Sequence, residues 1–176
     1  MDVKFYHCLT CGNIICKVVD SGVVPVCCGS EMILMEAKSV DNGLEKHLPH
    51  IEWLDDMTLR VKIGSEPHPC TKEHFIQMIA LQTVDGIDIR ILDPQKCLDE
   101  LARKEELAHL AQAHKEDKKC GLDLACRIEK LFSSKDGELS EVPVAWPEQI
   151  FHCNKKDAIG VYAYCNLHGL WHKSLR

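Results

Sequence analysis

The chain has 176 residues, 45% of them hydrophobic, which suits one ordinary domain or a small module joined to a medium one. Its formal net charge of −6 argues against a nucleic-acid-binding protein, because such proteins normally carry a basic face. No apolar run is long enough to span a bilayer, and the N-terminus lacks the pattern of a secretory signal. We therefore expect a cytoplasmic protein with no membrane and no nucleic-acid partner.

Cysteine and histidine are unusually frequent in this sequence. Eleven cysteines accompany ten histidines, and the odd number of cysteines without a secretory signal argues against a disulfide framework. In a reducing compartment, clustered cysteines more often bind metal. The composition therefore favours metal sites.

Residues 1–37 are expected to form a small module. Three short apolar segments, at residues 14–19, 23–26 and 32–35, lie close to glycine or cysteine, which is typical of short strands and tight turns. A module of this size buries too little apolar surface to be stable without a staple such as a metal. The polar residues 38–43 are the expected linker.

Residues 38–176 are expected to form an antiparallel β-sandwich. Residues 59–63 and 87–91 alternate with the period of a half-buried strand, and residues 75–81 form an apolar run. Turn residues separate these segments, which favours a sandwich over a helical bundle. The chain returns to strand at residues 159–164, so the predicted fold class is mainly β.

A helical insertion is expected to interrupt this domain at about residues 95–141. Residues 99–108 are rich in strong helix formers. The apolar residues that fall near one face of this helix are Leu98, Leu101, Ala108 and Ala111. Gly121 is the expected end of the first helix, and a second helix is expected around residues 124–131.

Four cysteines of the N-terminal module have the spacing of a metal-binding knuckle. Cys8 and Cys11 form a CxxC pair, and the adjacent Cys27 and Cys28 complete the set. Four thiolates at these spacings can close one tetrahedral site for iron or zinc, and the adjacent pair makes a distorted tetrahedron the expected geometry. A zinc knuckle that only stabilises the module is the alternative. Cys16 is left over and is expected to be a buried apolar residue.

Three short segments offer ligands for a second metal. The side chains concerned are His47, His68, His74, Cys165 and His168. Imidazole with one thiolate suits iron, zinc or copper, and the surplus of histidines argues against a blue-copper site. A single histidine would more often be a surface or hydrogen-bonded core residue, but three clustered motifs together favour a metal site.

On these motifs the sequence resembles a known family. Residues 1–37 resemble desulforedoxin, the remainder resembles neelaredoxin, and the combination resembles desulfoferrodoxin, the two-iron type of superoxide reductase. The motifs that carry the resemblance are Cys27-Cys28-Gly29 and Cys165-Asn166-Leu167-His168-Gly169-Leu170-Trp171. The resemblance covers about residues 1–94 and 142–176. It implies an immunoglobulin-like sandwich behind a small metal module, usually as a homodimer.

The resemblance also implies two irons in each chain. The ligands of the four-thiolate iron would be Cys8, Cys11, Cys27 and Cys28. The catalytic iron would have His47, His68, His74 and His168 as equatorial ligands and Cys165 as its axial ligand. Glu45 would occupy the sixth position in the oxidised resting state, and Lys46 would lie beside the open face.

The function that the resemblance implies is one-electron reduction of superoxide to hydrogen peroxide, with an external donor such as rubredoxin. Four neutral imidazoles and one thiolate leave ferrous iron with a single net positive charge, which attracts a small anion. Lys46 would add a positive charge that raises the on-rate more than the affinity. Two alternatives stay open: a non-catalytic iron electron carrier, and a zinc-stabilised binding module whose insertion docks a partner.

Two features depart from the family pattern. Cys70 stands where the family usually has methionine, close to a ligand loop. The insertion carries Cys97, Cys120 and Cys126, and Cys153 lies just beyond it. No function follows for these last four cysteines, and we expect separate buried or surface thiols.

Overall fold

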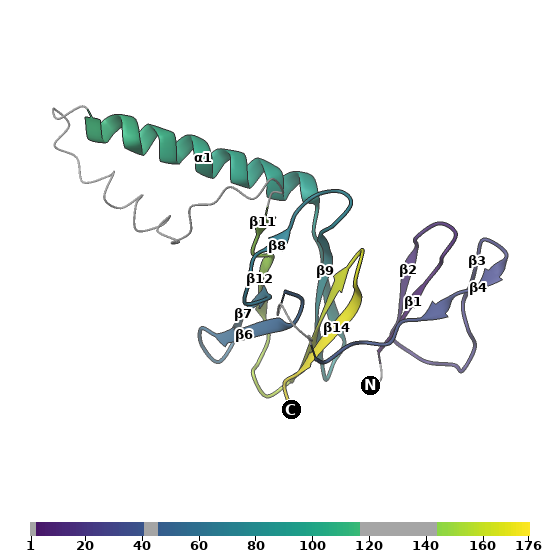
Figure 1. The fold of residues 1–176 in the computed structure, drawn as a ribbon. Helices are drawn as coiled ribbons and strands as arrows, with labels where there is room; N and C mark the ends of the chain where they lie inside the picture. The colour runs from purple at the N-terminus through teal and green to yellow at the C-terminus, as the bar shows by residue number, and fades with distance from the viewer. Residues whose placement is uncertain (1–2, 41–45, 117–143) are drawn as a thin grey trace.

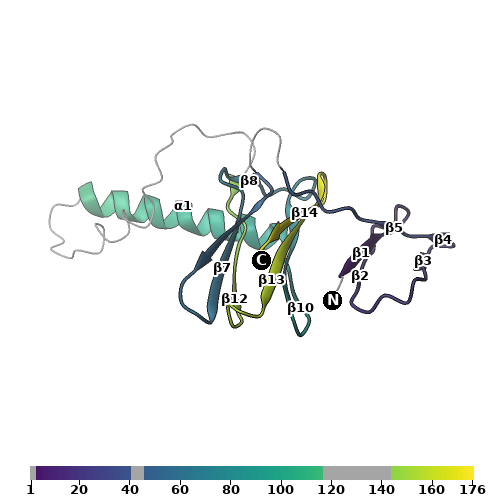
Figure 2. The ribbon, with the colours of Figure 1, turned by 90° about the horizontal axis from the view of Figure 1, so that it is seen from below.

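The computed structural model describes residues 3–40, 46–116 and 144–176, which form a mainly β protein (Figure 1). Two antiparallel sheets pack as a sandwich, and Figure 2 shows these two layers side by side. The first sheet has the order β10 (Ile87–Ile91), β9 (Ile76–Thr83), β13 (Ala158–Cys165) and β14 (Gly169–Ser174). The second has the order β12 (Glu148–His152), β7 (Thr58–Ile63) and β6 (Pro49–Trp53).

The main hydrophobic core lies between these two sheets. Side chains of a strand alternate between its faces, so every second residue points inward. On β7 the inward residues are Leu59, Val61 and Ile63, all fully buried, and they belong to the same cluster as Ile79 and Leu81 of β9. This core fixes the register of the strands, because a slip by one residue would expose every one of these side chains.

The prediction of a mainly β fold is confirmed. The four strands predicted for the sandwich correspond to β7, β9, β10 and β13, with ends that differ by at most two residues. The strands β6, β12 and β14 were not predicted, because histidine, glutamate and tryptophan weaken their alternation. β12, for example, buries only Phe151.

The outer face of the first sheet is covered by the N-terminal segment. Phe5 is fully buried and packs with Met78, Ala80 and Tyr164, and its ring centroid lies 5.2 Å from that of Tyr162. This contact explains why β9 is buried on both faces. The predicted division into residues 1–37 and 38–176 stays a prediction, and the two parts share this cluster.

The N-terminal segment forms two small sheets. One has the order β2 (Ile14–Lys17), β1 (Lys4–His7) and β5 (Ile33–Leu34), and the other pairs β3 (Val26–Cys27) with β4 (Ser30–Glu31). The strand predicted at residues 23–26 was wrong except for Val26, because Pro25 lacks the N–H that a ladder needs. Cys16, expected to be buried, is only half-buried.

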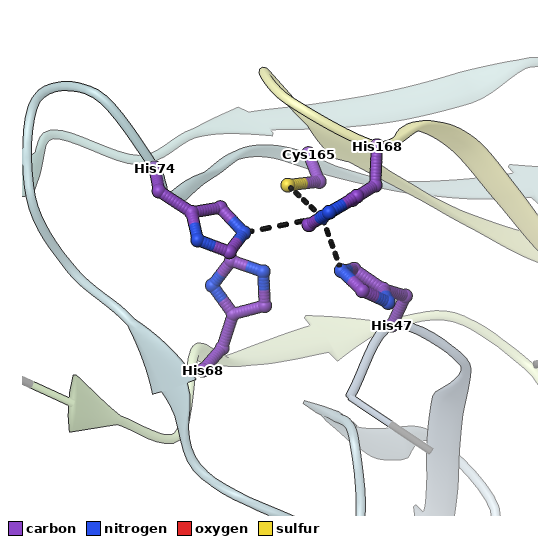
Figure 3. A group of neighbouring side chains, drawn as sticks. All are labelled: His47, His68, His74, Cys165 and His168. Carbon is purple, nitrogen blue, oxygen red and sulfur yellow. Dashed lines mark hydrogen bonds between the residues drawn. The ribbon is translucent and has the colours of Figure 1, made fainter. Parts of the chain in front are cut away.

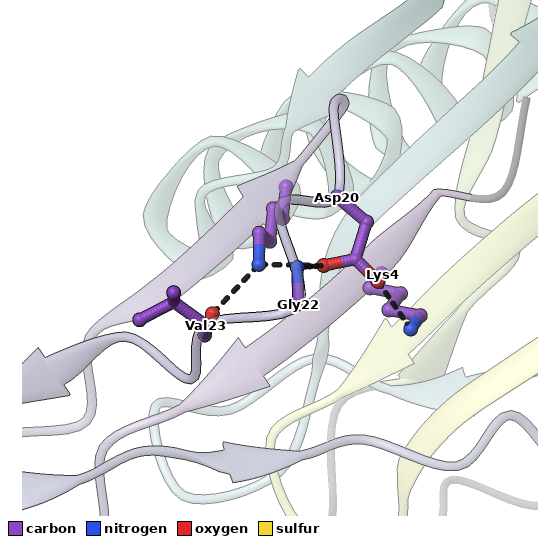
Figure 4. A network of polar contacts seen from close by, with 5 residues as sticks. Lys4, Asp20, Gly22 and Val23 are labelled. Atoms are coloured by element: carbon purple, nitrogen blue, oxygen red, sulfur yellow. Dashed lines mark hydrogen bonds and ion pairs between the residues drawn. The ribbon is translucent and has the colours of Figure 1, made fainter.

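A charged network fixes the turn after β2 (Figure 4). The Asp20 carboxylate accepts hydrogen bonds from Lys17, from Lys4 and from the N–H of Gly22. Lys17 also donates to the carbonyl of Val23 at 2.6 Å. Lys17 above all, and then Lys4, hold the pKa of Asp20 well below its usual range. The carboxylate therefore stays ionised, and the turn keeps its shape, over the whole physiological pH range.

The predicted helical insertion is confirmed in the part that the structure describes. α1 (Pro94–Glu116) begins at a proline, and the Asp93 carboxylate caps it by accepting the N–H of Gln95 at 2.9 Å. The helix projects away from both sheets (Figure 1). The expected end at Gly121, the second helix, Cys120 and Cys126 lie outside the described residues. The helical part of the described chain offers no apolar stretch that would cross a membrane.

A disulfide joins Cys70 to Cys97, so the expectation of separate thiols was wrong for Cys97. Cys70 follows β8 (His68–Pro69), which pairs with β11 (Val144–Ala145), and Cys97 lies in the first turn of α1. The antiparallel pairing of β9 with β10 returns the chain from the first cysteine to the second. This long-range pairing has no signal in the local spacing of the cysteines.

Candidate metal centres

Four histidines and one cysteine converge at one end of the sandwich (Figure 3). Their ligating atoms all lie within 4.8 Å of one another. The five side chains are His47 before β6, His68 in β8, His74 in the loop from β8 to β9, Cys165 at the end of β13, and His168 in the turn to β14. The structure thus brings together all five predicted histidine and cysteine ligands, whose role in binding iron stays a prediction.

Three of these groups approach a single ring nitrogen. Nδ1 of His168 lies 2.9 Å from Nε2 of His47, 3.1 Å from Nε2 of His74 and 3.5 Å from Sγ of Cys165. A neutral imidazole nitrogen offers either one proton or one lone pair, so it cannot satisfy three partners. A cation among them would satisfy all of the lone pairs.

The separations also discriminate between coordination geometries. With metal–nitrogen bonds of about 2.1 Å, ligands at right angles lie about 3.0 Å apart, whereas tetrahedral ligands lie about 3.4 Å apart. The distances of 2.9 and 3.1 Å between the ring nitrogens match the right angle. Right angles between neighbouring nitrogens would fit iron better than structural zinc, which is almost always tetrahedral.

His68 provides a separate test of whether a metal fits. Its ring is fully buried, and Nδ1 donates to the carbonyl of Pro69 at 2.7 Å, which leaves the lone pair on Nε2. Nε2 is buried and has no hydrogen-bond partner among the described residues. A buried polar atom without a partner is costly, so a metal bound at Nε2 fits this site.

The electrostatics of the site favour the neutral, ligand form of two of its histidines, His68 and His74. Burial lowers the pKa of His68 to about 4. Burial also lowers the pKa of His74, with further contributions from His168 and from the positive charge of Lys46. Lys46 is therefore close enough to the site for its charge to act on it. Glu45 lies outside the described residues.

Cys165 is the fully buried sulfur ligand of the group. Burial raises the pKa of its thiol, while the backbone N–H groups of Leu167 and His168 and the charge of Lys38 act in the opposite direction. The amide groups favour a thiolate, but burial opposes an unpaired negative charge. A cation bound to the sulfur resolves this conflict.

Lys38 and Trp171 support the site, although the sequence placed Lys38 only in the expected linker and Trp171 only at the end of the motif that begins at Cys165. The indole of Trp171 stacks on His47, with ring centroids 4.7 Å apart and an angle of 11°. Nζ of Lys38 lies 5.1 Å from the Trp171 ring centroid and donates to the carbonyl of His168 at 3.0 Å. The predicted linker therefore contributes a cation, Lys38, that contacts both the indole beside His47 and the backbone of His168.

Asn166 is a third supporting residue, which the sequence showed only as part of the motif that begins at Cys165. Its side-chain nitrogen donates to the carbonyls of Lys72 and Glu73, and its oxygen accepts the N–H of Phe75 at 2.9 Å. These bonds fix the loop that carries His74 against the turn that carries His168. Its position between Cys165 and His168 was the available signal.

The four cysteines of the N-terminal module form the second group. All four sulfur atoms lie within 4.8 Å of one another. Sγ of Cys27 lies 3.6 Å from Sγ of Cys11 and 3.9 Å from Sγ of Cys28. With metal–sulfur bonds of about 2.3 Å, a tetrahedron has edges of about 3.8 Å, so these distances fit one four-coordinate metal. The backbone of Cys28 has a φ of 51°, in the strained left-handed region, and this conformation lets the adjacent Cys27 and Cys28 face one site.

The four thiols cannot all ionise without a cation. The N–H of Cys11 points at the sulfur of Cys8 and lowers its pKa to about 6. The crowded thiols of Cys11, Cys27 and Cys8 raise the pKa of Cys28 to about 12. The group therefore has the chemistry of a four-thiolate metal site.

The low pKa of His68 predicts how acid affects the iron-free protein. Its folded-state pKa of about 4 is below the usual value of 6.5, so the unfolded chain binds the proton first as the pH falls. The contribution of neutral His68 to the free energy of unfolding is fully present above pH 6.5 and is lost as the pH falls from 6.5 through 4, by about 3 kcal/mol. Urea unfolding of iron-free wild type and His68→Gln at pH 7 and 4.5 measures this, and equal losses in the two proteins would contradict it.

The chain is similar to known proteins over most of its length. The desulfoferrodoxin family model matches residues 39–174. A desulfoferrodoxin homolog of Archaeoglobus fulgidus is 29% identical over 170 residues, covering 96% of this chain and 94% of that protein. A superoxide reductase of Pyrococcus furiosus is 26% identical over 144 residues, covering 80% and 94%. The structure of the superoxide reductase from Treponema pallidum covers 98% of both chains with a TM-score of 0.61 and 20% identity, which is a likeness of fold.

Proposed function

The chain belongs to the desulfoferrodoxin family, and from that premise we propose that it is a superoxide reductase, which reduces superoxide by one electron to hydrogen peroxide. The observation that carries the proposal is the convergence of His47, His68, His74, Cys165 and His168 within 4.8 Å. Iron bound there would supply the electron and a free coordination position for superoxide. The protein's own residues attract the anion and keep the ligating side chains in position.

The proposed roles of the side chains follow from their charge and burial. Neutral His68 and His74 add no charge of their own. Ferrous iron with neutral imidazoles and one thiolate would therefore keep a single net positive charge, which attracts superoxide. The thiolate of Cys165 donates electron density to the metal. Lys46 steers the anion and, with water, delivers protons to the product. Glu45 is proposed as the sixth ligand of the oxidised state.

Each turnover needs an electron from outside the protein, because the proposed reaction reduces superoxide and does not also oxidise it to recover the electron. A rubredoxin-like protein is the proposed donor. The four-thiolate site of Cys8, Cys11, Cys27 and Cys28 is proposed to hold the second iron, which would relay electrons or only stabilise the module. The homodimer and the cytoplasmic location stay predictions.

Metal content and the visible spectrum test this proposal together. We expect two irons in each chain and oxidation of the histidine-ligated iron when superoxide is added to the reduced protein, with peroxide as product. A colourless protein with zinc in both sites would instead support the zinc-stabilised module. Iron that reacts only through the four-thiolate centre would support the electron carrier. Either result would overturn the proposal.

Replacement of Lys46 with alanine tests its steering role. Its charge acts on His74, so we expect the rate of the superoxide encounter to fall by about 3–10-fold at low ionic strength and to depend less on salt. Stopped-flow or pulse-radiolysis rates over a salt series measure this. Lys173→Ala is the control, because Lys173 is exposed on β14 and its loss changes the net charge equally. Equal salt dependence in both variants would contradict the steering role.

A further inference from the structure

The disulfide of the fold connects the predicted ligand loop to the helical insertion. Cys70 lies between His68 and His74, and Cys97 lies in the first turn of α1, with the two Cα atoms 6.4 Å apart. Cys70 is 3% exposed, whereas Cys97 is only half-buried. Reagents from solution therefore reach the sulfur of Cys97 more easily than that of Cys70.

The sheet holds the two cysteines together without help from the covalent bond. β9 and β10 pair in antiparallel register as far as Met78 and Ile91, and the N–H of Leu92 donates to the carbonyl of Gln77 at 2.9 Å. This pairing places the start of α1 beside the loop that precedes β9. Two thiols held near each other in this way can close and open a disulfide without unfolding the domain.

The loop between His68 and His74 has two kinds of anchor. Near His74, Asn166 donates to the carbonyls of Lys72 and Glu73. Near His68, the anchors are the pairing of β8 with β11 and the disulfide itself. Breaking the disulfide removes the covalent anchor beside the buried ring of His68, so that ring should hold its position less firmly.

We propose that Cys70 and Cys97 are a reversible redox pair, whose disulfide is formed by hydrogen peroxide and slows the loss of metal from the neighbouring histidine site. The origin of the peroxide rests on the proposed function, whereas the bond and its effect on the loop do not. The closed form thus protects the ligand loop when the product of the proposed reaction accumulates.

The chemistry needs only peroxide for oxidation and a dithiol for reduction. Peroxide converts the Cys97 thiol to a sulfenic acid with release of water, and the Cys70 thiol then displaces a second water to form the S–S bond. Two electrons pass from the thiols to the peroxide, and both thiol protons end in water. In reduction, a dithiol attacks the Cys97 sulfur, the Cys70 thiolate leaves, and the dithiol becomes its own disulfide.

Peptide mapping tests the redox step directly. Trypsin releases residues 63–72 and 97–103 as peptides with one cysteine each. Iron-loaded protein is reduced with dithiothreitol, desalted without oxygen, treated with equimolar hydrogen peroxide and blocked with N-ethylmaleimide. We expect the two peptides to be cross-linked after peroxide and to separate again after dithiothreitol. Both peptides alkylated and unlinked after peroxide would overturn the proposal.

Release of iron to a chelator tests the effect on the loop. After peroxide, we expect the histidine site of the wild type to lose iron at least about 10-fold more slowly than that of Cys97→Ser. Cys153→Ser is the control and should match the wild type, because its half-buried thiol is free and belongs to neither metal group. Equal rates in wild type and Cys97→Ser would overturn the proposal. Peroxide is added directly, so a protein that fails to reduce superoxide still gives a clear result.

Discussion

Replacing Cys165 with serine should abolish superoxide reduction and leave the N-terminal metal in place. Cys165 supplies the one sulfur among the five converging groups, and it is fully buried. A serine hydroxyl has nearly the same shape but stays protonated, so the site loses its negative ligand. We expect turnover to fall by at least about 100-fold, measured with a superoxide source and reduced protein.

The metal content of the same variant separates the two sites. We expect Cys165→Ser to keep the iron of Cys8, Cys11, Cys27 and Cys28 while the histidine site loses or weakens its own. Cys153→Ser is the matched control, because it removes a half-buried thiol outside both groups and should keep full activity. Full turnover in Cys165→Ser would remove the basis of the proposed function.

Local sequence patterns were enough to find most of the sandwich and both clusters of ligating side chains. Alternation at residues 59–63 and 87–91 indicates a strand within a single segment, so β7 and β10 could be predicted without knowledge of their partners, although β7 buries its apolar face fully and β10 only in part. The cysteine pairs and the motif from Cys165 to Trp171 are equally local. The meeting of His74 with Cys165 and His168 rests on the long-range pairing of β9 with β13, which the sequence pattern does not contain.

Features that depend on distant contacts were missed for the same reason. Lys38 was assigned to a linker, yet its N–H donates to the carbonyl of Leu170 and its side chain reaches the carbonyl of His168. The bond between Cys70 and Cys97 likewise depends on how β9 and β10 pair. Polar residues such as Lys38 give no periodic signal, so only the fold reveals what they contact.

Gly64 is another such feature, and it explains how His47 reaches the site. Gly64 follows β7 with φ 77°, and its N–H donates to the carbonyl of Leu48 at 3.0 Å. A Cβ at this position would lie 2.7 Å from the carbonyl oxygen of Lys46 and 2.8 Å from that of Glu66. The backbone beside His47 can therefore approach β7 only because residue 64 has no side chain.

Gly64→Ala should accordingly destabilise the domain and weaken metal binding. The left-handed backbone alone costs an alanine about 1 kcal/mol, and the overlap with two carbonyl groups should raise the total to about 3 kcal/mol. Because the segment before β6 that carries His47 must move to relieve this overlap, we expect iron to be lost from the histidine site and retained by the four cysteines. Denaturant unfolding and metal analysis measure the two effects.

Gly169→Ala separates backbone strain from steric overlap. Gly169 has φ 84°, close to that of Gly64, but a Cβ there would meet nothing within 4 Å. Its replacement should cost only the price of the left-handed backbone, about 1 kcal/mol. If Gly64→Ala is no less stable than Gly169→Ala and binds iron equally well, then the close approach at residue 64 does not position His47. A clear difference in both measurements would tie the position of that histidine to one missing side chain.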